Sequence, residues 1–128
     1  MNTASLELCK ELYALSRWAL TEKHWYQGKP VYNAPYGWDC PAYDLNVLLE
    51  KLPKSVTEFW GRAYPASPCL MFSGTQWVIF YQSEMTGEHN TDELFGQFAD
   101  TPEDAACMLT IELFKQGVLK SATSKPSS

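Results

Sequence analysis

The two apolar runs on either side of Ser73-Gly74-Thr75 constrain the fold more than any other feature of this chain. Both runs are rich in aliphatic, β-branched and aromatic residues, and a short polar turn between such runs predicts an antiparallel β-hairpin at about residues 69–83. In the second run, Trp77 to Tyr81 follow one another without a polar break. Such a run indicates a strand that is covered on both faces or that faces a partner. Residues 94–98 are the candidate for a third antiparallel strand.

The strongest local signal for a helix is the sequence Thr101-Pro102-Glu103-Asp104. Threonine suits the N-cap, proline is favoured at the first helical position, and the two carboxylates suit the positive end of the helix dipole. Gly117 supplies the usual stop at the other end. We therefore expect a helix at about residues 102–116. Because apolar residues cover most of its circumference, it should be the most buried helix of the chain.

Two other segments, at about residues 5–20 and 41–52, show the spacing of amphipathic helices. For the second of them, proline favours the first helical position and pushes the residue before it out of the helical region. These preferences predict that Cys40 is the cap and that Pro41 is the first helical residue.

The order of these elements predicts an α+β domain in which three helices pack against a small antiparallel sheet. A chain of 128 residues is long enough for one core, which we expect to span residues 1–119 as a single domain. The polar residues 120–128 are expected to form a disordered tail.

The four cysteines are spread along the chain without the close pairs typical of zinc sites, which favours buried free thiols in a reducing compartment. The first residues lack the pattern of a signal peptide, and no run is long enough to span a bilayer, so a cytoplasmic protein is expected. A formal charge of -5 disfavours nucleic acid as a partner.

Aromatic residues are concentrated between residues 25 and 43, in a segment stiffened by proline and glycine. Rings held on such a loop can stack on a base, a sugar or the side chains of a partner at little entropic cost. The alternative, which the sequence slightly favours, is that several rings cover the edge of a small core. Under the first interpretation the candidate binding residues are Trp25, Tyr26, Tyr36 and Trp38.

Catalytic chemistry has little support in the sequence. The two histidines are His24, beside two aromatic residues, and His89, in a polar loop where a solvated surface role is the default. The charged residues around His89 do not match a calcium loop. No phosphate-binding glycine motif occurs either. The sequence predicts no catalytic residue, no metal ligand and no cofactor.

A resemblance to known proteins is carried by three blocks of the chain, LCKELYALSRW, CPAYDLNVLLEKLPK and ADTPEDAACMLTIELFKQGVL. Together with the aromatic hairpin between the last two, they resemble a group of small uncharacterised proteins encoded by bacteriophages and prophages of gut bacteria. The matching residues are caps, turns and core positions. The resemblance implies a phage or prophage origin and carries over no catalytic residue.

The expected function is that of a non-enzymatic phage or prophage accessory protein that binds a host protein. One alternative is a protein that binds a small ligand, a nucleotide or a sugar, through the aromatic segment. A second is a small enzyme with a site around His24 or His89. A homodimer is a further expectation if the strand at residues 77–81 lies at the edge of a sheet.

Overall fold

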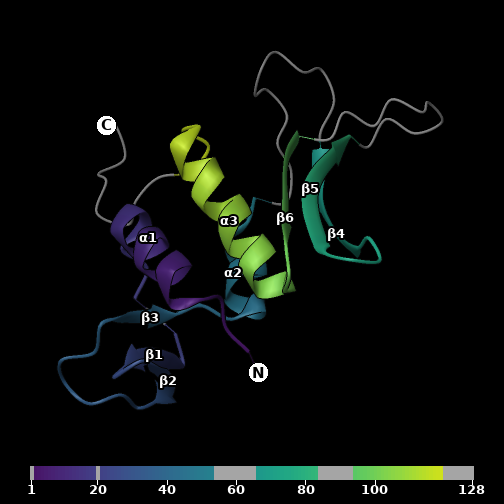
Figure 1. Ribbon diagram of the computed structural model, residues 1–128. Coiled ribbons are helices and arrows are strands. Elements are labelled where there is room, and N and C mark those ends of the chain that lie inside the picture. The colour runs from purple at the N-terminus through teal and green to yellow at the C-terminus, as the bar shows by residue number, and fades with distance from the viewer. Residues whose placement is uncertain (1, 20, 54–65, 84–93, 120–128) are drawn as a thin grey trace, which may run out of the picture.

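A computed structural model of the chain describes residues 2–19, 21–53, 66–83 and 94–119 (Figure 1). Within these ranges the chain has helices and antiparallel sheets, so the α+β class is confirmed. In chain order the elements are α1 (Leu6–Ser16), β1 (Lys23–Tyr26), β2 (Lys29–Tyr32), β3 (Cys40–Ala42), α2 (Leu45–Lys51), β4 (Ala66–Phe72), β5 (Trp77–Ser83), β6 (Leu94–Ala99) and α3 (Pro102–Lys115).

The predicted hairpin and third strand form one sheet with the strand order β4-β5-β6. Its tight turn is closed by Ser73, whose backbone N–H donates to the Gln76 carbonyl oxygen at 2.8 Å, and Gly74 adopts a φ of 103°. Strand β5 is the central strand, hydrogen-bonded on both sides. The condition on which a homodimer through residues 77–81 was expected is therefore not met, because both edges of β5 are paired within its own sheet. The long apolar run is explained by burial of residues 78–81.

A second sheet, with the order β2-β1-β3, corrects the expectation of a single sheet. Its hairpin turns at Gln27 and Gly28, both of which have positive φ, as the two central residues of a tight hairpin turn require. Strand β3 pairs with the other side of β1, where Trp25 lies opposite Cys40.

The start of α2 is also a correction. Cys40 and Pro41 belong to β3, and the helix begins after Asp44, whose carboxylate accepts a hydrogen bond from the Val47 backbone N–H at 2.9 Å. Aspartate is a much better N-cap than cysteine because its side chain can accept that bond. Proline is tolerated at the edge of a sheet, and β3 is an edge strand of its sheet.

The other two helices agree with the sequence except in length. Helix α1 stops at Ser16, not near residue 20, because Arg17 takes a left-handed conformation with a φ of 59°. Helix α3 is capped as predicted by Thr101, whose hydroxyl oxygen accepts from the Asp104 N–H at 3.1 Å. Asp104 also joins the two helix starts, since its carboxylate accepts a hydrogen bond from the Ser5 N–H at 2.7 Å.

The core surrounds α3, which contacts α1, α2, β5 and β6. Figure 1 shows the two sheets on different sides of the helices, with β4-β5-β6 beside α3 and the smaller sheet beyond one end of α1. Two buried tyrosines fasten the parts together: Tyr43 donates to the Trp18 carbonyl oxygen and Tyr81 to the Pro53 carbonyl oxygen, both at 2.6 Å. No helix in the described part of the chain has the length and apolar character needed to cross a bilayer. The predicted tail at residues 120–128 lies outside the described residues.

Candidate functional site

The predicted binding segment is a loop held at both ends by the β2-β1-β3 sheet. It leaves β2 at Asn33, which has a left-handed φ of 49°, and returns where the Asp39 N–H donates to the Trp25 carbonyl oxygen at 2.8 Å. Gly37, with a φ of 100°, allows the reversal between these points. The sheet therefore holds both ends of the loop, and the apex of the loop lies between these two fixed points.

Trp25 belongs to the edge of the core. Its side chain is half-buried and packs against the core cluster. The indole Nε1 is fully buried and has no hydrogen-bond partner among the described residues. The position of Trp25 fits the interpretation that some of these rings cover the core.

Trp38 lies in a cluster of rings that ties the loop to β1 and α1. Its ring centroid is 4.4 Å from that of His24 and 6.0 Å from that of Tyr13 in an edge-to-face arrangement. The Arg17 guanidinium lies 5.4 Å from the Tyr13 ring centroid. Contacts of this kind fix the indole while leaving it half-exposed.

The tyrosines of the segment differ sharply in exposure. Tyr36 at the loop apex is fully exposed, and Tyr32 at the end of β2 is 59% exposed. Tyr26 is half-buried, and its hydroxyl oxygen accepts a long hydrogen bond of 3.5 Å from the Gln27 side-chain amide. We call Tyr32, Tyr36 and Trp38 the aromatic surface. Sequence reasoning did not select Tyr32, because nothing local distinguishes it from the other rings.

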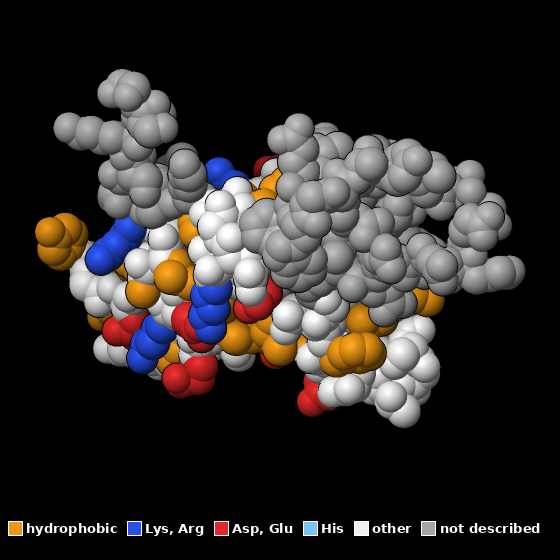
Figure 2. Space-filling model, turned by 90° about the horizontal axis from the view of Figure 1, so that it is seen from above, with side chains coloured by type: hydrophobic (Ala, Val, Ile, Leu, Met, Phe, Trp, Pro, Cys, Tyr) orange, Lys and Arg blue, Asp and Glu red, His pale blue; other side chains and the backbone are white. Residues whose placement is uncertain are grey.

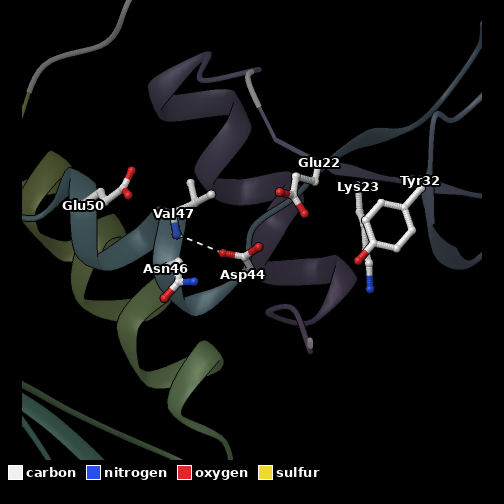
Figure 3. Close-up of a pocket in the computed structure, with 7 residues that line it drawn as sticks. All are labelled: Glu22, Lys23, Tyr32, Asp44, Asn46, Val47 and Glu50. Atoms are coloured by element: carbon white, nitrogen blue, oxygen red, sulfur yellow. Dashed lines mark hydrogen bonds between the residues drawn. The ribbon is translucent and has the colours of Figure 1, made fainter.

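A cavity of about 400 Å³ adjoins this surface between the β1-β2 hairpin and α2 (Figure 3). We call it the acidic cavity. Its lining combines carboxylates from separate elements with an aromatic ring, an amide and one ammonium group, and consists of Glu22, Lys23, Tyr32, Asp44, Asn46, Val47 and Glu50.

Charge in the acidic cavity is unbalanced. Three carboxylates line it against a single ammonium group, that of Lys23, which lies 4.7 Å from the centroid of the Tyr32 ring. One carboxylate oxygen of Asp44 accepts a hydrogen bond from the Val47 backbone N–H, which is drawn as the dashed line in Figure 3. The excess of negative charge attracts cations and repels phosphates. In Figure 2, by contrast, basic and acidic side chains are interspersed over the face that is seen there.

Three of the four thiols in the described chain have little nucleophilic character. The fourth, Cys69 on β4, is half-buried. Cys9, Cys40 and Cys107 are buried, and burial raises the pKa of each thiol, to about 12 for Cys40. The Cys9 and Cys107 thiols donate to the backbone carbonyl oxygens of Ala4 and Leu8 at 3.4 and 3.6 Å. Thiols of high pKa are inert because the thiolate is the reactive form.

Metal-binding and histidine chemistry are also limited in the described residues. These residues contain no group of three or more histidine, cysteine, aspartate and glutamate side chains placed to hold a metal ion. His24 packs on an indole, and His89 with its acidic neighbours lies outside the described residues.

A second exposed apolar surface lies on the β4-β5-β6 sheet. The register aligns Met71, Val78 and Phe98 in one row on the face opposite the core residue Ile79. The two outer members of this row are more than half exposed, and the three strands contain no charged residue. We call this row the outer sheet face.

Comparison of the chain with family models, with curated proteins and with solved structures finds no match. The resemblance to phage and prophage proteins therefore stays a prediction, and the site has to be interpreted from its geometry.

Proposed function

We propose that this chain is a non-enzymatic binding protein whose aromatic surface contacts another protein. The observation that carries the proposal is the full exposure of Tyr36 at the apex of a loop fixed at both ends. Because the ring is not buried there, it gains no hydrophobic stabilisation when the chain folds. Exposed tyrosine and tryptophan on rigid supports are typical of protein-binding surfaces, where they dominate the binding energy.

Preorganisation supports the same function. The half-exposed indole of Trp38 is held by ring contacts to His24 and Tyr13, so little conformational freedom is lost when a partner covers it. Burial raises the pKa of three thiols, and the His24 ring is stacked on Trp38, so these described groups support a binding role over catalysis.

The partner that we propose is a host protein in the bacterial cytoplasm, bound by a phage or prophage accessory protein. This part of the proposal follows from the resemblance of the helix and hairpin blocks to proteins encoded by bacteriophages and prophages. The acidic balance of the chain supports a protein with a basic surface as the partner over a nucleic acid.

A specific observation favours one alternative, a small-ligand binding protein. The acidic cavity, which shares Tyr32 with the aromatic surface, has the size of an ordinary ligand pocket. Its three carboxylates disfavour a nucleotide, whose phosphates they would repel, and leave an uncharged sugar as the better candidate. Native mass spectrometry of the purified chain tests this alternative, which predicts a copurified sugar.

The main test compares two single substitutions in exposed aromatic residues, Tyr36→Ala on the aromatic surface and Phe98→Ala on the outer sheet face. Each chain is used to capture proteins from a lysate of gut bacteria, and the affinity of the captured protein is then measured by calorimetry. We expect Tyr36→Ala to weaken binding at least tenfold and Phe98→Ala to leave it unchanged. A captured protein that binds both variants equally well argues against the proposal.

A further inference from the structure

We infer that the acidic cavity receives a cationic side chain of the arginine type from the protein that the aromatic surface contacts. This inference rests on the proposed function and adds the chemistry of the partner. It is carried by a cavity of suitable size, by the excess of carboxylates over ammonium groups in the described lining, and by the Tyr32 ring, which belongs to both the cavity and the aromatic surface.

The charge of the lining selects a cation. Three carboxylates against one ammonium group leave the cavity with an excess of two negative charges, and within the described ranges Glu22 and Glu50 have no ion-pair partner. Charge of one sign in a concave site focuses the field and raises the local concentration of the opposite charge. The net charge of the whole chain has the same sign.

The spacing of the carboxylates selects an extended cation over a metal ion. Glu22 precedes β1, Asp44 caps α2 and Glu50 lies in the last turn of that helix, so the three groups stand around the cavity. They are not gathered closely enough to hold a metal ion. A guanidinium group, with five N–H donors in a planar fork, can reach more than one carboxylate at a time.

The Tyr32 ring links the cavity to the aromatic surface. It lines the cavity and is also more than half exposed, and a Lys23 ammonium already lies over its face. A second cation in the cavity would meet the same ring, which favours arginine because its planar group stacks on aromatic faces. One segment of a partner can therefore contact Tyr36 and insert its cationic side chain beside Tyr32.

The first experiment tests the cavity without a partner. The full chain, labelled with nitrogen-15, is titrated with N-acetyl-arginine amide and separately with N-acetyl-citrulline amide, which has the same shape without the charge. We expect the arginine compound to shift the backbone amide signals of Lys23, Asn46 and Val47, and added salt to weaken the effect. Equal shifts with the citrulline compound, or shifts confined to other residues, overturn the inference.

The second experiment uses matched charge changes. The double variant Glu22→Gln/Glu50→Gln removes two cavity carboxylates and spares the capping Asp44, and the control Glu7→Gln/Asp100→Asn removes two exposed carboxylates elsewhere. We expect the cavity variant to bind the arginine compound at least tenfold more weakly and the control to bind it within twofold of the unsubstituted chain. Unchanged binding by the cavity variant overturns the inference.

These experiments distinguish failure of the proposed function from failure of the cation-binding inference. If Tyr36→Ala weakens capture of the partner while Glu22→Gln/Glu50→Gln does not, the proposed function stands and the cationic side chain is excluded. If the cavity variant binds the arginine compound weakly but neither variant changes capture, the cavity binds cations and the aromatic surface is not the site of contact.

Discussion

The two sheets of this protein share a construction and differ in what surrounds them. Each consists of a hairpin with a third strand added antiparallel to one of its two strands, so that β1 and β5 are the central strands. In β5, residues 78–81 are buried on both faces of the sheet. In β1, every residue is only half-buried. The larger sheet therefore completes the core with α3, whereas the smaller sheet covers one side of it.

The smaller sheet is attached through its shortest strand. All three residues of β3, Cys40, Pro41 and Ala42, are buried, and β3 contacts α1. The β1-β2 hairpin beyond it carries charged and aromatic residues in place of core residues. A strand of three buried residues therefore anchors a hairpin whose own residues are half-buried or exposed.

The largest effect is expected from truncation in β5. Ile79→Ala removes a fully buried side chain from the interface with α3 and should lower the free energy of unfolding by about 2–5 kcal/mol. The matched change in the smaller sheet, Val31→Ala, concerns a half-buried residue and should cost only about 1 kcal/mol. Urea unfolding of both variants measures the difference, and equal losses would show that the two sheets contribute equally to the core.

Alkaline pH should loosen the smaller sheet first. The pKa of the Cys9, Cys40 and Cys107 thiols is raised in the folded chain above an ordinary value near 9, so the unfolded chain loses these protons first. The stability that they contribute is complete below about pH 9 and falls as the pH rises toward the folded value, about 12 for Cys40.

Because Cys9 and Cys40 lie where α1 meets β3, amide hydrogen exchange of β3 should accelerate more than that of β5 between about pH 9 and pH 10, after correction for the intrinsic rates. Above about pH 10 the buried Tyr81 of β5 also destabilises the fold, because burial raises the pKa of its hydroxyl. The comparison uses the unsubstituted chain and the Cys40→Ala variant. Identical pH dependence of both strands in both proteins would contradict this prediction.

A smaller and stabilising effect is expected at the turn of the β1-β2 hairpin. Gln27 has a φ of 52° before Gly28, and asparagine adopts that conformation more easily than glutamine in such turns. Gln27→Asn should therefore raise the free energy of unfolding by about 0.5 kcal/mol. Gln76→Asn, at a position without positive φ, is the control. A loss of stability in Gln27→Asn would show that its side chain has another role.

The smallest effect is expected where binding is proposed. Tyr36→Ala removes a fully exposed ring and should change the free energy of unfolding by less than about 0.5 kcal/mol. Thermal unfolding monitored by circular dichroism checks this. A large loss would mean that the ring supports the loop, and the aromatic surface would then belong to the fold.

The parts of the fold that could be predicted are those with local signals. The apolar run of β5 and the capping sequence before α3 determine their elements from neighbouring residues alone, and both were found where the sequence placed them. The β3 strand could not be found this way, because Cys40-Pro41-Ala42 is a strand only through its pairing with β1 and its burial under α1. With no signal for that pairing, Pro41 was interpreted as the start of a helix.

The candidate site shows the same division. Composition predicts the aromatic segment, but its sequence does not distinguish Trp25, which packs against the core, from the exposed Tyr36. The acidic cavity could not be predicted at all, because its carboxylates at positions 22, 44 and 50 line one cavity only after the hairpin folds beside α2.

The bond between Ser5 and Asp104 has a consequence for synthesis. The two residues are separated by 99 positions, so the ribosome releases the first helix long before the carboxylate that accepts its leading N–H has been translated. Until then water must satisfy that donor. Closure of the bond joins the start of α1 to the first turn of α3, which makes it a marker for the moment at which these two helices have come together.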